Sequence, residues 1–267
     1  MQLYLRDDIK SYFVSSTPLF EQLMALAGER FRHQEGRLTQ RVLLGDKYYF
    51  IKQHRGVGWK EICKNWLQLR LPIVSAYNEW RAIRTLKNLG IAVPPIAAYG
   101  ERGINPAKRQ SFILLEELAP TISLEDLCKN WPASPPSFNL KKNLIAEVAH
   151  IANKLHQYGM NHRDFYICHF LLDVPNGVEK INPQQLKLHL IDLHRAQIRR
   201  ITPERWRVKD LAGLYFSSKD IGLTQRDLFR FMQRYAKKSL RQIMQEDKDF
   251  WQKVMQRGER LYRDHLK

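Results

Sequence analysis

The segment His162–His169 constrains the fold of this chain more than any other part of its sequence. It begins with His-Arg-Asp, and a histidine stands five residues after Asp164. When a phosphoryl group is transferred to an alcohol, the hydroxyl proton needs an acceptor, and a loop aspartate can supply it. The fifth residue after such an aspartate is a common position for a metal ligand. Because a tripeptide recurs by chance, the interpretation depends on the segments around it.

Two apolar runs after this segment predict a β-hairpin. They cover residues 169–174 and 186–192, and a turn-forming Pro-Asn-Gly sequence follows the first run. The hairpin would bring Asp192 back toward Asp164, so that both carboxylates can face one phosphate-bound Mg²⁺. In kinases the second aspartate belongs to an Asp-Phe-Gly motif. Here Leu and His follow Asp192, so only the aspartate of the motif is present.

Two segments upstream carry groups that would hold the phosphates of ATP. The aromatic and β-branched run Lys47–Lys52 predicts a strand that places Lys52 on the phosphates. Residues 77–89 have apolar side chains at helical spacing, and Gly90 with the prolines after it ends this predicted helix. Glu79 lies in the first turn and is the expected partner of Lys52.

The run Ser111–Leu118 predicts a buried strand that leads into a hinge. We expect the exposed backbone at its end to bind adenine, which gives the nucleotide-binding role to Glu116, Glu117 and Leu118. Each feature alone is more often structural than functional. The ordered series of lysine, glutamate, hinge, His-Arg-Asp and second aspartate is far more specific, because every member lies on the element that its role requires. The sequence therefore predicts a kinase.

The predicted fold class is α+β, a bilobal protein-kinase-like fold with a small β-rich N-lobe and a larger helical C-lobe. We expect residues 1–118 to form the N-lobe with the hinge, and residues 119–267 to form the C-lobe of one kinase-like domain. At 267 residues the chain is long enough for two lobes with a substantial core.

Motifs spread over nearly the whole chain narrow the prediction to one family. They occupy residues 54–56, 120–125, 159–172, 191–197, 205–211, 214–218 and 221–227. Together they resemble the lipopolysaccharide core heptose(I) kinases of Gram-negative bacteria. The resemblance implies ATP-dependent phosphorylation of the first heptose of the inner core at its 4-hydroxyl, with Asp164 as catalytic base beside His162 and Arg163. Phe165 stands where the resemblance leads us to expect cysteine, but phosphoryl transfer does not use that side chain.

The metal site departs from the pattern of protein kinases, because His169 stands in place of asparagine. Mg²⁺ prefers oxygen ligands, so Asp192 is the expected ligand of one firmly held Mg²⁺. His169 would orient the site or bind a second ion weakly. The segment from Asp192 to Asp210 is short and lacks an Ala-Pro-Glu motif, which favours a small-molecule or glycolipid kinase.

The chain has a net charge of +17 and a pI near 9.9, so it attracts anions. No nucleic acid partner is expected, because the sequence has no motif that reads DNA or RNA. An anionic glycolipid, the lipopolysaccharide inner core, suits the basic residues that follow Asp192. The expected acceptor contacts are Arg195, Arg199, Arg205 and Arg207. Any one of these charges could instead only solvate a basic surface.

The expected location is the cytoplasm. Three cysteines form no even set for a disulfide framework. Residues 1–8 lack the apolar core of a signal peptide, and no apolar run approaches the ~20 residues of a membrane span. Peripheral contact with the cytoplasmic face of the inner membrane stays open.

The segment Gly56–Arg70 predicts a basic amphipathic helix. Its apolar residues at helical spacing are Trp59, Ile62, Cys63, Trp66 and Leu69, and its positive charges are Lys60, Lys64 and Arg70. Such a helix can lie in a membrane interface. It can equally dock an acidic protein, acyl carrier protein being one candidate, or simply pack on the small lobe. We favour packing slightly.

Three other functions remain in competition. A protein tyrosine or serine kinase would be distinguished by acceptor assays. A non-catalytic kinase-like adaptor is disfavoured because Lys52, Asp164 and Asp192 are all retained. A basic nucleic-acid-binding protein would show salt-dependent binding without kinase activity.

Overall fold

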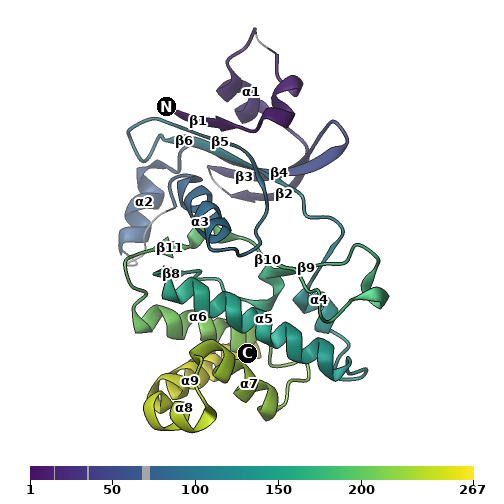
Figure 1. Cartoon of the computed structure of the whole chain (residues 1–267). Coiled ribbons are helices and arrows are strands. Elements are labelled where there is room, and N and C mark those ends of the chain that lie inside the picture. Colours follow the sequence, from purple (N-terminus) through teal and green to yellow (C-terminus); the bar gives the residue numbers. More distant parts are fainter. Residues whose placement is uncertain (15, 35, 68–72) are drawn as a thin grey trace. The chain divides into compact units, whose positions relative to one another are not determined.

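The computed structural model describes residues 1–14, 16–34, 36–67 and 73–267. The chain divides into two compact units (Figure 1). Unit 1 contains Met1–Thr85 and Pro94–Leu118, and unit 2 contains Leu86–Val93 and Ala119–Lys267. Over the described residues, no helix is both long enough and apolar enough to cross a membrane.

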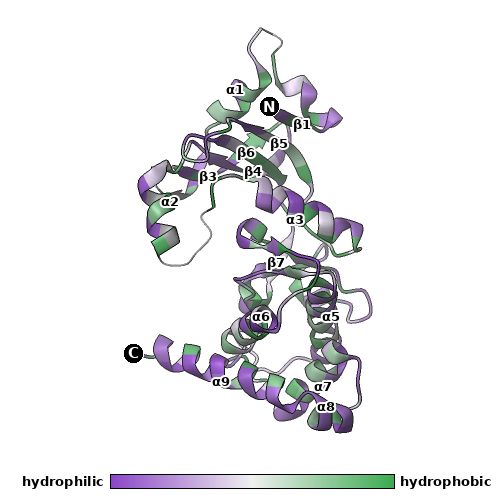
Figure 2. Ribbon diagram, turned by 90° about the vertical axis from the view of Figure 1, so that its left-hand side faces the viewer, coloured by the Kyte–Doolittle hydropathy of each residue, from purple (hydrophilic) through white to green (hydrophobic). Residues whose placement is uncertain are grey.

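Unit 1 is built on an antiparallel sheet with the strand order β1-β5-β6-β4-β3-β2. Its strands are β1 Gln2–Leu5, β2 Glu29–Gln34, β3 Arg37–Leu44, β4 Lys47–His54, β5 Ile96–Arg102 and β6 Gln110–Glu116. Its helices are α1 Leu19–Ala25, α2 Gly58–Leu67 and α3 Tyr77–Asn88. Figure 2 shows hydrophobic stretches in this sheet, and the apolar run Phe112–Leu115 of β6 is buried, which fits the place of β6 between β5 and β4.

Strand β4 positions a lysine because its side chains alternate between two faces. Tyr49 and Ile51 are 1% and 0% exposed and belong to a core that also contains Phe20 and Phe112. The rings of Phe20 and Phe112 lie 5.3 Å apart. Lys52 therefore projects from the face of the sheet opposite this core.

Unit 2 is mainly helical. Its helices are α4 Leu124–Cys128, α5 Phe138–Gln157, α6 Glu204–Ser217, α7 Gln225–Ala236, α8 Leu240–Glu246 and α9 Lys248–His265. Side-chain caps fix several of their starts: Ser137 caps α5, and a Thr224–Asp227 capping box begins α7. Helix α9 packs along α6, and Gly258 permits this closeness, because a Cβ there would lie 2.5 Å from the Tyr215 ring.

The predicted hairpin is present in unit 2. Strands β9 Phe170–Asp173 and β10 Leu188–Leu190 are antiparallel, with Leu172 opposite Leu188. Strand β7 Thr121–Ser123 pairs with the other edge of β9. A second pair joins β8 Met160–Asn161 to β11 Gln197–Ile198.

Gly159 allows this second pair to form. Its φ of 76° lies in the left-handed region, and a Cβ would lie 1.9 Å from the carbonyl oxygen of Arg199. Only glycine fits a site with both constraints. Gly159 lies three residues before His162 and thereby sets where the chain enters the His-Arg-Asp loop.

Helix α2 occupies much of the segment predicted to be amphipathic. Ile62 is 1% exposed and packs with Val57 and Ala107, whereas Trp59 is 51% exposed. Lys60, Cys63 and Lys64 are also exposed. Leu69 and Arg70 of the predicted helix lie outside the described residues. One side of α2 therefore packs on unit 1 while Trp59 and the lysines face solvent.

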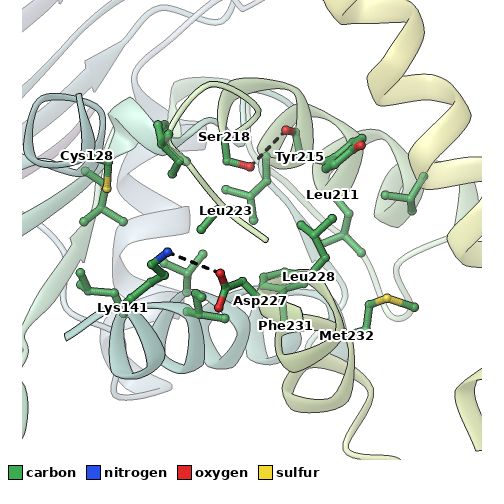
Figure 3. A pocket seen from close by; sticks show the side chains of 18 of the residues that line it. Cys128, Lys141, Leu211, Tyr215, Ser218, Leu223, Asp227, Leu228, Phe231 and Met232 are labelled. Carbon is green, nitrogen blue, oxygen red and sulfur yellow. Dashed lines mark hydrogen bonds and ion pairs between the residues drawn. The ribbon is translucent and has the colours of Figure 1, made fainter. Parts of the chain in front are cut away.

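An apolar cavity of about 120 Å³ lies in unit 2 (Figure 3). Residues that line it from four helices include Leu124, Leu144, Val148, Leu211, Leu214 and Phe231. Polar groups take part at two points. Lys141 Nζ lies 3.5 Å from Asp227 Oδ2, and the Ser218 hydroxyl donates to the backbone of Tyr215.

Candidate active site

Unit 1 contains the ion pair that the sequence led us to expect between Lys52 and Glu79. Lys52 Nζ lies 2.7 Å from Glu79 Oε1. Strand β4 supplies the lysine, and the first turn of α3 supplies the glutamate, which is 2% exposed. Because a buried carboxylate is stable only with a partner, the pair fixes the lysine in space.

The predicted adenine-binding hinge is also in unit 1. The Glu116 N–H donates to Pro95 O, and the Glu117 N–H donates to Tyr48 O, both at 2.9 Å. The Glu117 side chain pairs with Arg41 at 2.7 Å. These two amide donors are thus already engaged, so neither is available to a base nitrogen. This engagement of the two amide groups differs from the sequence-based expectation of an exposed hinge backbone.

Asp210 of α6 holds the His-Arg-Asp loop of unit 2. Its Oδ2 accepts from the His162 N–H at 2.6 Å, and its Oδ1 accepts from the Arg163 N–H at 2.8 Å. Arg163 has a φ of 78°, a left-handed conformation that costs about 1–2 kcal/mol in a bulky residue. Two charge-assisted hydrogen bonds to a carboxylate that is 1% exposed offset this strain. The sequence analysis missed this role of Asp210.

A buried network supports Asp210 from behind. His156 Nε2 lies 3.4 Å from Asp210 Oδ2, and His156 Nδ1 lies 2.9 Å from the hydroxyl of Tyr235. The Thr202 hydroxyl donates to the carbonyls of His156 and Met160. Helices α5, α6 and α7 therefore converge on the carboxylate that shapes the loop.

His162 links the two predicted catalytic aspartates through their backbone. Its Nε2 lies 3.0 Å from the carbonyl of Ile191, which can only accept, so Nε2 carries the proton. Its Nδ1 then accepts from the Asp164 N–H at 3.3 Å. Burial lowers the pKa of His162 and keeps the ring neutral, as both hydrogen bonds require. The residue acts as a spacer between the loop and the strand that precedes Asp192.

His169 and Asp192 form the candidate metal site. His169 Nδ1 donates to the backbone carbonyl of Asp164 at 2.7 Å, which leaves the lone pair of Nε2 3.7 Å from Asp192 Oδ2. A histidine that ligates a metal usually donates its other ring N–H in this way. His194 Nδ1 bonds the other Asp192 oxygen at 2.7 Å. Asp192 is itself left-handed, with a φ of 58°.

The donors at this candidate site are one carboxylate, from Asp192, and one imidazole, from His169. Among the described residues, no group of three His, Cys, Asp or Glu side chains could hold an ion together. Mg²⁺ is commonly bound by one or two carboxylates, with water and substrate phosphates completing its octahedron. The Asp192 carboxylate agrees with that mode, whereas the imidazole of His169 is not an oxygen ligand.

Arg195 contacts the predicted base directly. Its Nη1 lies 2.7 Å from Asp164 Oδ1, and the two side chains are 32% and 16% exposed. A three-residue 3-10 turn, Leu193–Arg195, starts at the left-handed Asp192 and carries the arginine back to the loop. The residue was predicted to bind the acceptor, and the structure places its guanidinium on Asp164.

The other three arginines predicted to contact the acceptor lie in two different places. Arg199 donates to the amide oxygens of Asn161 and Gln197. Arg199 and Arg205 both lie near the ring of Trp206, at 5.6 and 5.5 Å from its centroid. Arg207 instead lies 5.0 Å from the centroid of Phe250. Arg199 and Arg205 are thus brought together, and Arg207 is not part of their group.

The lysine–glutamate pair between a strand of the six-stranded sheet and a helix, together with the anchored His-Arg-Asp loop, defines a phosphotransferase of the protein-kinase-like class. Residues 21–235 match the family described as the lipopolysaccharide kinase (Kdo/WaaP) family. The chain belongs to this family.

Relatives of known activity match nearly all of the chain. The lipopolysaccharide core heptose(I) kinase WaaP of Pseudomonas aeruginosa is 45% identical over 98% of this chain and 96% of its own. That of Escherichia coli K12 is 49% identical over 91% of this chain and 90% of its own. Both are phosphotransferases that act on a hydroxyl group, which confirms the predicted enzyme class.

A solved structure confirms the predicted fold class. WaaP in complex with acyl carrier protein matches with a TM-score of 0.85 and 41% sequence identity. The match covers 98% of this chain and 100% of the other. The predicted α+β kinase-like fold, with a sheet-based small part and a helical larger part, is therefore correct.

Proposed function

We propose that this protein transfers the γ-phosphoryl group of ATP to the 4-hydroxyl of the first heptose in the lipopolysaccharide inner core. The observation that carries the proposal is the Asp164 carboxylate, half-buried on a loop fixed by Asp210 and contacted by Arg195. The two relatives named as core heptose(I) kinases support the acceptor, since each matches at least 90% of both chains.

The residues of unit 1 would hold the nucleotide. Lys52, fixed by Glu79, would contact the phosphates of ATP. Glu116, Glu117 and Leu118 would lie along adenine, with the amide N–H groups of the first two already engaged. Because ATP use is general to kinases, this part of the proposal concerns only which residues bind it.

The residues of unit 2 would handle the acceptor and the metal. Asp192 and His169 would hold Mg²⁺, which neutralises charge on the phosphates when bound. Asp164 would take the proton of the acceptor hydroxyl as its oxygen bonds to phosphorus, while His162 and Arg163 keep the loop in place. Arg195, Arg199 and Arg205 would face the anionic acceptor, whereas Arg207, which was also predicted to do so, lies over Phe250.

The test is transfer of labelled γ-phosphate from ATP to purified inner core that lacks heptose phosphate. Asp164→Ala and Asp192→Ala should each abolish transfer while the far-ultraviolet circular dichroism is unchanged. Asp46→Ala, at an exposed turn, is the matched control and should leave turnover intact. Near-normal turnover by either of the first two variants would overturn the assignment, and NMR of the product tests the 4-hydroxyl.

We also propose an acyl carrier protein as partner, because a relative that is 41% identical forms such a complex. Two surfaces could take part. The exposed Lys60 and Lys64 of α2 suit an acidic protein. The apolar cavity of unit 2 suits the acyl chain that a carrier of this kind bears (Figure 3).

Two variants separate these surfaces. A Lys60→Glu/Lys64→Glu double variant should weaken binding of both acylated and unacylated carrier protein. Leu223 lines the cavity and is half-exposed. A Leu223→Trp side chain would fill part of the cavity and should weaken binding of the acylated carrier protein only. If both variants bind both forms as tightly as the wild type, the partner proposal fails.

The proposed location is the cytoplasm, with peripheral contact at the inner membrane where a lipid-linked acceptor would lie. The exposed Trp59 beside Lys60 and Lys64 supports that contact. Co-sedimentation with anionic vesicles checks it, and the lysine reversals on α2 should release the protein if the contact is real.

A further inference from the structure

Four cations surround one indole ring in unit 2. The distances to the centroid of the Trp206 ring are 5.6 Å for Arg163 Cζ, 5.6 Å for Arg199 Cζ, 5.5 Å for Arg205 Cζ and 5.4 Å for Lys209 Nζ. They come from three separate parts of the chain: the catalytic loop, the residue after β11, and α6. A surface that is basic only for solubility would not gather cations from three segments at one point.

Three of the four cations have no acidic partner at ion-pair distance within the described part of the chain. Among the residues that the structure describes, no acidic side chain forms an ion pair with Arg199, Arg205 or Lys209. The printed partners of Arg199 are neutral amide oxygens. Burial and the charge of Arg205 lower the pKa of Arg199, and burial with Arg163 and Arg195 lowers the pKa of Lys209. A π face attracts one cation by about 0.5–2 kcal/mol, which does not offset the mutual repulsion of Arg199, Arg205 and Lys209.

The cluster adjoins the predicted base. The charge of Asp164 acts on Lys209, and Arg163 is the residue before Asp164 in the catalytic loop. An acceptor whose hydroxyl reaches Asp164 would therefore bring its neighbouring substituents to the cluster. Guanidinium groups match the geometry of carboxylates and phosphates, and several around one point select an oxyanion.

We propose that Trp206, Arg163, Arg199, Arg205 and Lys209 form a receptor for an oxyanion, carboxylate or phosphate, carried by the acceptor beside its reacting hydroxyl. This inference rests on the proposed function for the identity of the acceptor. It adds Arg163, Lys209 and Trp206 to the acceptor contacts and excludes Arg207, which packs on Phe250. The Trp206 ring would hold the cations in place when no acceptor is bound.

The kinetic test uses Lys209→Met and Arg205→Gln, with Arg200→Gln as matched control at an exposed neighbouring position. Each of the first two should raise the KM for acceptor about tenfold, the usual loss for one charge-assisted hydrogen bond, and leave the KM for ATP unchanged. The control should change neither constant. Equal losses in all three variants, or losses in the KM for ATP, would overturn the proposal.

Modified acceptors identify the oxyanion. On acceptor whose carboxylates are reduced to alcohols, or on dephosphorylated acceptor, the wild type should lose affinity and the variants should lose little more. If the variants and the wild type have the same KM on one of the modified acceptors, the group that this acceptor lacks is the group bound by the cluster. If the variant penalty is the same on native, carboxyl-reduced and dephosphorylated acceptors, no oxyanion of the acceptor is bound here.

A direct measurement separates this inference from the proposed function. The indole N–H resonance of Trp206, assigned with Trp206→Phe, is followed during titration with inorganic phosphate and with glucuronate. It should shift to saturation in the wild type and in Arg200→Gln, and not in Lys209→Met. If the Trp206 resonance saturates with an anion but no phosphoryl group is transferred to the glycolipid, the oxyanion receptor is supported and the proposed acceptor is refuted. A resonance that does not move with either anion would refute the receptor.

Discussion

The contact between Arg195 and Asp164 leads to a quantitative prediction. Replacing Arg195 by alanine should lower kcat for phosphoryl transfer and leave the KM for ATP near its wild-type value. The physical reason is that the guanidinium fixes one carboxylate oxygen of the base, 2.7 Å away, through a charge-assisted hydrogen bond. Without it, Asp164 samples orientations in which neither oxygen meets the acceptor hydroxyl.

The expected size follows from the geometry. A hydrogen bond to a charged group contributes about 1.5–3 kcal/mol when both groups are shielded from water. Arg195 is 32% exposed, so solvent reduces this contribution toward the lower half of the range, about 2 kcal/mol. At about 1.4 kcal/mol for each tenfold change in rate, kcat should fall about 30-fold. Arg195→Lys retains the charge but not the fork and should lie between the wild type and alanine.

A double-mutant cycle with Asp164→Asn tests whether Arg195 acts through the base. Initial rates are measured with labelled ATP for the wild type, both single variants and the pair. If the reasoning is right, Arg195→Ala slows the residual reaction of Asp164→Asn by much less than 30-fold, because the oxygen that it held is no longer a base. Full additivity, or a wild-type kcat for Arg195→Ala, would refute it. Exposed Arg200→Ala should change neither rate.

Three further predictions concern the ion pair, the buried histidine and the metal site. Lys52→Met should raise the KM for ATP at least tenfold. It should also destabilise the fold by about 3 kcal/mol, because the buried Glu79 loses its partner. Adding Glu79→Gln should restore stability in urea unfolding but not ATP affinity, and a double variant as unstable as the single one would contradict this. Burial lowers the pKa of His162, so the unfolded chain binds more protons below the ordinary histidine value of about 6.5. Its contribution to the free energy of unfolding is therefore complete above that pH and declines below it, by at most about 1.4 kcal/mol per pH unit, and His162→Gln should flatten the decline between pH 6.5 and 5.5. His169→Asn should keep more activity than His169→Ala in a Mg²⁺ titration, because Asn supplies an oxygen ligand; equal and severe losses would point to a role that only an imidazole can fill.

Features set by local pattern could be predicted from the sequence. Alternating apolar residues predicted the β9–β10 hairpin, and helical spacing predicted α3 to within a residue or two of its observed ends. The contact of Lys52 with Glu79 followed from the kinase pattern, which pairs a strand lysine with a glutamate in the first turn of a later helix.

Features set by tertiary contacts could not be predicted. The role of Asp210 depends on α6 passing behind the catalytic loop, which no spacing in the chain reveals. The turn of Arg195 toward Asp164 depends on a left-handed backbone at Asp192, a conformation uncommon for a residue other than glycine. The sequence also did not indicate a role for Trp206 in binding cations, since a tryptophan among arginines on a helix usually packs against neighbouring side chains.

The anchoring of the loop by Asp210 determines when the loop acquires its shape. Because a buried carboxylate of α6 supplies both amide acceptors, the loop is complete as soon as unit 2 has folded, and ligand arrival adds no ordering step. The amide protons of His162 and Arg163 would then exchange with solvent as slowly as those of a helix, although they lie in a loop.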